Sequence, residues 1–200
     1  MRIRQVPHIE GNFSTHVFIS IDPKLPWVTQ VQEKSLGVLN RLTEKPCSRL
    51  ENLHVSLSRH VFLKPHMIDR FLQRLSEALT KRNKTIIFLA EGYKGYLNDS
   101  SNTCFIAIPV NIELSPVIID LIESVNHVFQ EFDLECFYDD PSPHVSLACC
   151  SNESGFKFPS ILTLDDPLPL SDEELEDLFI PVEIISVSVG REVFSIKLAT

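Results

Sequence analysis

The tetrapeptide His-Val-Ser-Leu occurs twice in the chain, at residues 54–57 and again at residues 144–147. Both copies follow turn-prone segments and begin runs that alternate between apolar and polar residues, which is typical of a β-strand. In a strand, residues i and i+2 point to the same face. Each histidine is therefore expected to stand beside the serine that follows it by two residues, while the valine and leucine point into a core.

Two such strands, brought together, would place two imidazoles and two hydroxyls on one surface, namely those of His54, Ser56, His144 and Ser146. This set of groups suits phosphodiester transfer. A neutral imidazole accepts a proton from the attacking hydroxyl and an imidazolium donates one to the leaving oxygen, and both forms of histidine coexist near neutral pH. The serine hydroxyls donate hydrogen bonds to the phosphate oxygens as negative charge develops. Because the ribose 2′-OH of RNA is a built-in nucleophile, we expect no metal and no other cofactor.

Other kinds of site have less support in the sequence. No Gly-x-Ser-x-Gly elbow of a serine hydrolase occurs. The five cysteines include no Cys-x-x-Cys pair, which argues against a zinc site and favours a reducing compartment. Of the remaining histidines, His60 and His66 are interpreted as surface or capping residues, and His16 has no partner in a repeated motif.

The charge is distributed unevenly along the chain. The net charge of the 200 residues is −9, but residues 1–100 hold 15 Lys and Arg against 9 Asp and Glu, whereas residues 101–200 hold 3 against 18. Affinity for a long phosphate backbone grows with the number of basic contacts. An acidic chain with a basic half therefore favours an enzyme that holds a few nucleotides over a protein that coats RNA.

No apolar run approaches the ~20 residues that a membrane-spanning helix needs. The N-terminal residues MRIRQVPHIEGN lack the apolar stretch of a signal peptide. We therefore expect a soluble protein that is not secreted and has no membrane partner.

Periodicity predicts a mixed fold. Strands are expected at 15–21, 53–58, 85–90, 103–110, 144–149, 182–189 and 192–198, with Gly190-Arg191 as the turn between the last two, and helices at 25–42, 66–82 and 116–132. Ser115 is a candidate N-cap for the third helix, followed by Pro116 at its first position. Residues 151–180 are interpreted as an irregular excursion with one short helix. Because strands and helices do not alternate strictly, the pattern favours an α+β protein with antiparallel sheet over a doubly wound fold, in one domain over residues 1–200.

The sequence also resembles a known family. The two HVSL copies match the His-x-Ser/Thr-hydrophobic signature of the two-histidine (2H) phosphoesterase superfamily. Within it, the chain resembles the U6 small nuclear RNA 3′-phosphodiesterases over nearly its whole length. The most similar segments are RIRQVPHIEGNFSTHVFI at 2–19, LENLHVSLSRHVFL at 50–63, FDLECFYDDPSPHVSLACC at 132–150 and VGREVFSIKL at 189–198.

The resemblance implies a fold of two intertwined, pseudo-symmetric lobes of antiparallel sheet with flanking helices around a central cleft. It implies a monomeric nuclear 3′→5′ RNA exonuclease that trims the uridine- or adenosine-ended tail of U6 RNA, in the service of mRNA splicing. The 2′-OH attacks the phosphate, and the product ends in a 2′,3′-cyclic phosphate, as from a lyase, or in a 3′-phosphate, as from a hydrolase. Neither the product nor the preferred base can be read from the sequence.

Site residues carry over by position in the matching motifs. His54 and His144 correspond to the catalytic pair, with His144 assigned as the base and His54 as the acid, and Ser56 and Ser146 hold the phosphate. Tyr138 corresponds to an aromatic residue that stacks on the terminal base.

Three further residues are expected to contact the nucleotide. Asp140 and Ser142 lie in the turn before the second HVSL copy, and Asp99 lies in the loop that follows residue 96.

Two alternative functions stay open at this stage. One is another 2H activity, such as a cyclic phosphodiesterase or a 2′,5′-oligonucleotide phosphodiesterase, against which the N-terminal and 137–144 segments argue. The other is a non-catalytic RNA-binding protein on the same fold, against which the presence of both histidines argues.

Overall fold

The protein is described here by a computed structural model that covers residues 11–43, 46–98, 100, 102–152 and 161–200. In chain order the elements are β1 (Phe13–Ser20), α1 (Pro26–Leu42), β2 (Cys47–Arg49), β3 (His54–Ser56), β4 (Val61–Leu63), α2 (Pro65–Leu79), β5 (Thr85–Phe88), β6 (Gly92–Leu97), β7 (Thr103–Pro109), α3 (Val117–Glu131), β8 (His144–Ser151), β9 (Ile161–Pro167), α4 (Asp172–Glu176), β10 (Phe179–Val182), β11 (Ile184–Val189) and β12 (Glu192–Lys197).

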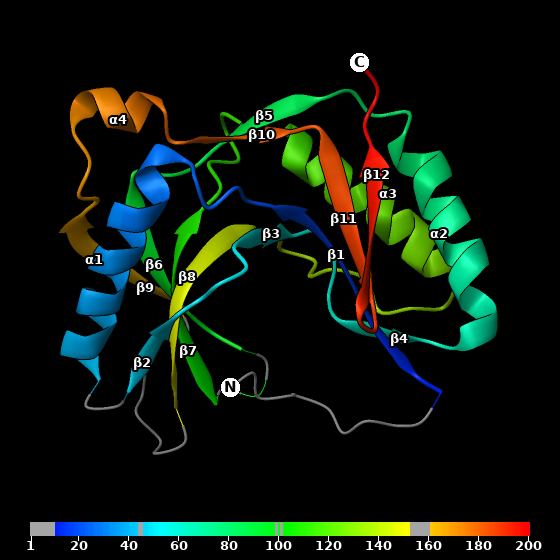
Figure 1. Ribbon diagram of the computed structural model, residues 1–200, viewed down its shortest axis with the longest axis horizontal. Coiled ribbons are helices and arrows are strands. Elements are labelled where there is room, and N and C mark those ends of the chain that lie inside the picture. Colours follow the sequence, from blue (N-terminus) through cyan, green and yellow to red (C-terminus); the bar gives the residue numbers. More distant parts are fainter. Residues whose placement is uncertain (1–10, 44–45, 99, 101, 153–160) are drawn as a thin grey trace.

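Ten of the described strands form one sheet, in which the order is β12-β11-β1-β3-β8-β7-β6-β9. β2 also pairs with β8, and β4 with β1, while β5 and β10 form a separate pair. Every pairing between these strands is antiparallel. The two strands that carry the HVSL repeat, β3 and β8, are therefore neighbours in the middle of the sheet (Figure 1).

The repeat forms strands because its apolar positions alternate. Val55 and Val145 have no exposed surface, and neither do Leu57 and Leu147. The histidines and serines between them are only half-buried, so one face of the β3–β8 pair is core and the other carries polar groups. Burial of these four aliphatic side chains stabilises the pairing by roughly 1.5–3 kcal/mol for each.

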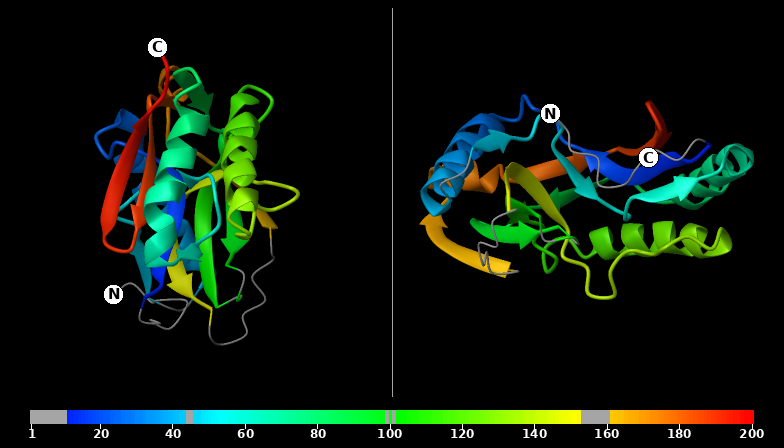
Figure 2. Two further views of the ribbon diagram at one scale, coloured as in Figure 1. Left: turned by 90° about the vertical axis from the view of Figure 1, so that its right-hand side faces the viewer. Right: turned by 90° about the horizontal axis from the view of Figure 1, so that it is seen from below.

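Helices cover the two halves of the sheet separately. α1 packs against β8, β2 and β7 through a buried stripe that includes Trp27, Val31 and Leu39. α2 and α3 pack against each other, with the rings of Phe71 and Phe129 meeting edge to face at 5.6 Å, and α2 reaches β12. Figures 1 and 2 show α1 at one end of the sheet and the α2–α3 pair at the other. The expected α+β class with antiparallel sheet and flanking helices is thus confirmed.

The predicted hairpin at the C-terminal end is present. Val189 pairs with Glu192, so Gly190 and Arg191 form a two-residue turn. Gly190 has a φ of +62°, a conformation that glycine adopts without steric cost.

Two local expectations were wrong. Ser115 does not cap α3: its buried hydroxyl accepts a hydrogen bond from the backbone N–H of Phe88 at 2.7 Å and so ties the start of the helix to β5. The expectation for residues 151–180 was wrong in part: the described residues of this range include the expected short helix, α4, but also the strand β9. The alternation of β9 is obscured in the sequence by Asp165, Asp166 and Pro167.

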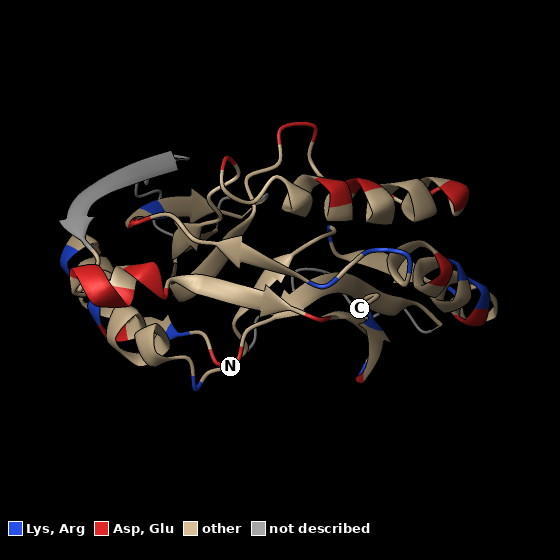
Figure 3. Ribbon diagram, turned by 90° about the horizontal axis from the view of Figure 1, so that it is seen from above, with Lys and Arg blue, Asp and Glu red and all other residues tan. Residues whose placement is uncertain are grey.

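Part of the acidic surplus of the second half lies on two helices. Figure 3 marks Asp and Glu positions in red along α3 and α4, whereas α2 carries both signs. Neither β3 nor β8 contains an acidic residue, so the strands of the repeat remain free of negative charge. No helix in the described part of the chain is long and apolar enough to cross a membrane.

Candidate active site

The register between β3 and β8 brings the two halves of the repeat together. Val55 lies directly opposite Val145 in the antiparallel pair. The adjacent positions therefore place His54 across from Ser146 and Ser56 across from His144, related by a local two-fold between the valines. Because the valines point into the core, all four polar side chains share the opposite face. The predicted juxtaposition of the two histidines and two serines is observed.

Both imidazoles are held by the same local hydrogen bond. Nδ1 of His54 lies 2.8 Å from the carbonyl oxygen of Asn52, and Nδ1 of His144 lies 2.7 Å from that of Ser142. A carbonyl oxygen only accepts hydrogen bonds, so Nδ1 carries the proton in each ring and donates it. In the neutral form each imidazole then has its lone pair on Nε2, the nitrogen directed away from its own backbone. The two rings are thus oriented alike for proton transfer at Nε2.

The surroundings of His144 favour its neutral form. The ring of Tyr96 stacks on the imidazole, with centroids 4.0 Å apart and planes at 15°. Burial lowers the pKa of His144 below its usual value, and the nearby His54 lowers it further, although the hydrogen bond to the Ser142 carbonyl acts in the opposite direction. His144 is therefore a neutral imidazole at neutral pH, ready to accept a proton.

Ser142 connects His144 to the aromatic ring above it. Its hydroxyl lies 3.1 Å from the Tyr96 hydroxyl, while its carbonyl accepts from His144 Nδ1. Burial raises the pKa of Tyr96, so the phenol stays protonated at neutral pH despite its hydrogen bond with Ser142. Ser142, expected as a nucleotide contact, thus lies in the site as a support for the histidine.

The surroundings of His54 are different. Its ring meets the ring of His16 edge to face at 5.2 Å and that of Phe18 at 5.3 Å. His16 is almost fully buried, and its Nε2 lies 3.0 Å from the Ser56 hydroxyl. His60 stacks on His16 at 4.2 Å. His16, which has no partner in a repeated motif, thus contacts both a serine and a histidine of the repeat.

Tyr138 lies at the surface beside a basic residue. Its side chain is 42% exposed, and the guanidinium of Arg59 stands 4.0 Å from the centre of its ring. Arg59 also forms an ion pair with Glu135, so it links the segment after β3 to the loop that precedes β8. A guanidinium over a tyrosine face gives a cation–π attraction of about 0.5–1 kcal/mol at an exposed site. The ring is therefore accessible and held in orientation.

Two acidic residues, Asp140 and Asp99, were also expected to contact the nucleotide. Asp140 is exposed in the loop before β8, close in sequence to Ser142. Asp99 lies outside the described residues, and its expected contact stays a prediction.

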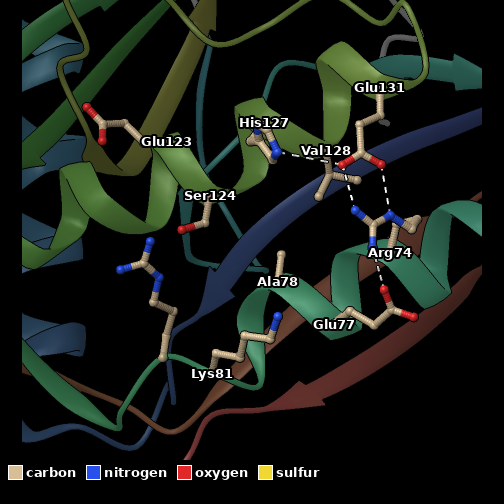
Figure 4. A pocket seen from close by; sticks show the side chains of 10 residues that line it. Arg74, Glu77, Ala78, Lys81, Glu123, Ser124, His127, Val128 and Glu131 are labelled. Atoms are coloured by element: carbon tan, nitrogen blue, oxygen red, sulfur yellow. Dashed lines mark hydrogen bonds and ion pairs between the residues drawn. The ribbon is translucent and has the colours of Figure 1, made fainter.

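A hollow lies between α2 and α3. It has a volume of about 360 Å³ and is lined by charged groups that include Lys81 and Glu123. Arg74 donates two hydrogen bonds to Glu131 and one to Glu77, and His127 approaches Glu131 (Figure 4). These contacts raise the pKa of Arg74, so its charge is already engaged by two carboxylates. None of the lining residues belongs to either His/Ser pair.

No group of three or more His, Cys, Asp or Glu side chains suited to a metal ion occurs among the residues that the structure describes. The donor set at the repeat is two histidines and two hydroxyls, and both Nδ1 atoms already donate to carbonyls.

Comparison with known proteins gives the family. A family model described as "HVSL: Uncharacterised conserved protein" matches residues 1–197. The protein named U6 snRNA phosphodiesterase 1 of Drosophila melanogaster is 30% identical over 205 residues, which cover 98% of this chain and 74% of that protein. The chain belongs to the U6 snRNA phosphodiesterase 1 family. The Bos taurus and Danio rerio members are 33% and 34% identical over 76% and 74% of this chain. These matches span 56% and 52% of those two longer proteins, about half of their length.

Solved structures share the fold. The structure of Kluyveromyces marxianus Usb1 matches with a TM-score of 0.61 and 13% identity, covering 94% of this chain and 98% of that one. Apo LigT of Escherichia coli matches with a TM-score of 0.55 and 12% identity, covering 94% and 99%. A fold shared at such low identity agrees with the expected 2H phosphoesterase architecture.

Two residues at the site of this U6 snRNA phosphodiesterase 1 family member are not predicted by its sequence motifs. His16 and Tyr96 lie on β1 and β6, in segments without a repeated motif. Tyr96 reaches His144 from β6, which is separated from β8 in the sheet by β7. The one available signal for His16 was its alternation with the buried Val17 and Ile19, which places it on the same strand face as Phe18.

Proposed function

We propose that the chain is a metal-independent RNA phosphodiesterase that trims the 3′ end of U6 snRNA in the 3′→5′ direction. The observation that carries the proposal is the Val55–Val145 register, which presents two Nδ1-anchored imidazoles and two hydroxyls on one face. The names of its relatives support U6 snRNA as the substrate. The structure of Kluyveromyces marxianus Usb1 with uridine monophosphate, which matches this chain with a TM-score of 0.61 and 14% identity, supports nucleotide binding by this fold.

The reaction begins with proton transfer to His144. Its Nε2 accepts the proton of the 2′-OH on the penultimate nucleotide, and the 2′-oxygen attacks the adjacent phosphorus. The bond from phosphorus to the 5′-oxygen of the terminal nucleoside breaks, and that oxygen takes a proton from Nε2 of the His54 imidazolium. The shortened RNA then ends in a 2′,3′-cyclic phosphate. Opening by water with the two roles exchanged would give a 3′-phosphate.

The assignment of His144 as base rests on its environment. Burial under Tyr96 keeps it neutral at neutral pH, as a base must be before the reaction. After this step the roles are exchanged, because His144 now holds a proton and can act as the acid, whereas His54 has lost its proton and can act as the base. The two rings therefore need the same orientation, which their Nδ1 bonds supply.

The serines act on the phosphate. Each hydroxyl lies across the strand pair from the opposite histidine, so Ser56 and Ser146 flank the same position from two sides. Their hydroxyls donate hydrogen bonds to the non-bridging oxygens, whose charge grows in the transition state.

Tyr138 binds the nucleobase of the terminal nucleotide. Its exposed ring offers a stacking surface for the terminal base, and stacking tolerates both uridine and adenosine. Asp140, Ser142 and Asp99 complete the proposed nucleotide contacts, Ser142 also through its hold on His144.

The remaining assignments follow from this function. We propose that residues 1–200 act as one domain, as a monomer and in the nucleus. The match over nearly the whole chain with the Drosophila relative supports the single domain, and the U6 snRNA in that relative's name supports the nuclear location.

The test is turnover of a synthetic oligouridine with a free 3′-OH, present in large excess over the protein, with and without a chelator. We expect stepwise shortening from the 3′ end that is unaffected by the chelator, and shortening that is slower by ~10²–10⁴ with His54→Ala. Binding without turnover would instead indicate a non-catalytic RNA-binding protein. Turnover restricted to cyclic phosphates or to 2′,5′-linked oligonucleotides would indicate another 2H activity. Loss of activity with the chelator and its recovery with Mg²⁺ would exclude the proposed mechanism.

A further inference from the structure

A third histidine, His16, contacts the phosphate-binding half of the site. It lies on β1, with 4% of its surface exposed, and its Nε2 is 3.0 Å from the hydroxyl oxygen of Ser56. β1 pairs with β3 in a register that puts Phe18 opposite Ser56, so His16 and Ser56 emerge on the same face of neighbouring strands. The sequence repeat does not account for this contact, because β7 carries Ala107 opposite Ser146 and no histidine in its range Thr103–Pro109.

The position of His16 is fixed on several sides. The backbone of Val17, the next residue, donates to the Ser58 hydroxyl at 2.9 Å and accepts from the N–H of Leu57 at 2.9 Å. The His16 ring stacks on Phe18 with centroids 5.2 Å apart and planes at 17°, and on His60 at 4.2 Å and 25°. Its Nε2 is therefore held against Ser56 before any substrate arrives.

The contact between His16 and Ser56 allows two arrangements of one proton. A hydroxyl has a single hydrogen and two lone pairs. If Ser56 donates to His16, the hydroxyl presents only lone pairs to the anionic phosphate, and the arrangement is that of a nucleophile with its base. If His16 donates from Nε2–H, the hydrogen of Ser56 remains available for a phosphate oxygen.

We propose that His16 is a positioning residue that donates from Nε2–H to the Ser56 hydroxyl and so directs the single hydroxyl hydrogen at the non-bridging phosphate oxygen. This inference rests on the proposed function of Ser56. It assigns His16 the tautomer opposite to that of His54 and His144, whose Nδ1–H groups donate to carbonyls. The three histidines thus divide into two that exchange protons and one that does not.

The ring of His16 makes a second contact besides its hydrogen bond to Ser56. An imidazole that donates to Ser56 also packs edge to face against His54 at 5.2 Å. One rigid side chain therefore contacts both polar residues of the first motif, but only Ser56 through a hydrogen bond.

The kinetic test compares His16→Gln with His16→Ala. The amide N–H of glutamine donates at about the position of Nε2 but is not a base at neutral pH. We expect His16→Ala to lower kcat about tenfold, the worth of one hydrogen bond, with KM nearly unchanged, because the bond from Ser56 strengthens with the charge of the transition state. His16→Gln should restore kcat to within about threefold of the unchanged protein. Equal losses in both variants would contradict donation and favour a base at His16.

A double variant tests whether His16 acts through Ser56. In the Ser56→Ala background, His16→Ala should cause almost no further loss, since there is no hydroxyl left to orient. A further full tenfold loss would show an independent role and overturn the inference. Thr15→Val, at a buried position on the same strand whose side chain faces the other way, is the matched control and should leave kcat unchanged.

A measurement without turnover separates this inference from the proposed function. Long-range ¹H–¹⁵N NMR spectra of the intact protein identify which ring nitrogen of each histidine carries the proton. We expect Nε2–H at His16 and Nδ1–H at His54 and His144 in their neutral forms. An Nδ1–H tautomer with a bare Nε2 at His16 overturns the inference even in an active enzyme. If His16 carries the Nε2–H tautomer but the protein does not turn over RNA, the proposed orientation of Ser56 is supported and only the proposed function is contradicted.

Discussion

The ring of Tyr96 lies flat on the imidazole of His144, with centroids 4.0 Å apart, although the two residues come from strands that are not neighbours in the sheet. The contact removes one face of His144 from water, and burial is the main reason that the pKa of this histidine is lowered. The phenol also reaches Ser142, whose carbonyl anchors the same imidazole. Tyr96 therefore couples the proton affinity of His144 to its orientation.

Tyr96→Ala should move the acid side of the pH–rate profile. The proposed base works only when neutral, so kcat/KM falls as pH decreases through the pKa of His144. Exposure to water raises that pKa toward its ordinary value of 6.5, and this limb should shift to higher pH. Tyr96→Phe keeps the ring and should shift the limb much less. The measurement is kcat/KM from pH 5 to pH 9 for the three proteins, and an unmoved limb in Tyr96→Ala would show that Tyr96 does not control the base.

Replacing either catalytic histidine by alanine should lower kcat by ~10²–10⁴, the usual contribution of one positioned proton-transfer group. The double variant His54→Ala/His144→Ala should be little worse than the poorer single variant, because acid and base act in one concerted step. Ser56→Ala and Ser146→Ala should each cost ~10²–10³. Single-turnover rates measure these losses, and circular dichroism checks the fold. Near-normal rates in both folded histidine variants would show that the repeat is only structural.

The main features of the fold and site could be predicted from sequence because they depend on local periodicity. A two-residue alternation around His54 and His144 determines which side chains share a face, and the same alternation buries Val55 and Val145. The three long helices follow from apolar stripes, and the hairpin from Gly190. The pairing of β3 with β8 in the middle of the sheet does not follow from local periodicity alone. It requires the further assumption that two strands with matching polar faces lie side by side.

The residues that were missed depend on contacts between distant segments. His16 reaches Ser56 across 40 positions of sequence, and Tyr96 reaches Ser142 across 46. Such contacts depend on strand order and register, which no local pattern contains. The short strands β2 and β4, of three residues each, are too brief to show a period of two. Ser115 looked like a cap by residue type, but the packing of β5 against α3 gave its hydroxyl another donor.

Tyr138→Ala should weaken substrate binding and leave the chemical step nearly intact. Stacking on a base is made in ground and transition states alike, so the loss of ~1–3 kcal/mol should appear in KM, or directly in the Kd of an uncleavable oligonucleotide. Tyr138→Phe keeps the stacking face and is the matched control.

Arg59→Met should produce a smaller loss in the same direction. It removes the guanidinium that stands 4.0 Å from the Tyr138 ring but keeps a long side chain over it. The expected cost is ~0.5–1 kcal/mol in binding. A loss of kcat larger than the loss in binding would show that Arg59 acts on the reacting phosphate and not on Tyr138.

The position of the nucleophile can be tested with single sugar substitutions. In the proposed reaction the attacking group is the 2′-OH of the penultimate nucleotide, so a 2′-deoxy sugar there should abolish the first cleavage. An intramolecular nucleophile held at the phosphorus is worth an effective concentration of ~10⁵–10⁸ M, an advantage that attack by water lacks. A 2′-deoxy sugar on the terminal nucleotide is the matched control: it removes one hydroxyl from the substrate but not the nucleophile, and that nucleotide should be removed at nearly the normal rate. Gel analysis of the two oligonucleotides, together with the all-ribose parent, measures both rates. Efficient trimming of the penultimate 2′-deoxy substrate would mean that an activated water or a protein side chain attacks the phosphorus, and His144 would then need another proton donor as its partner.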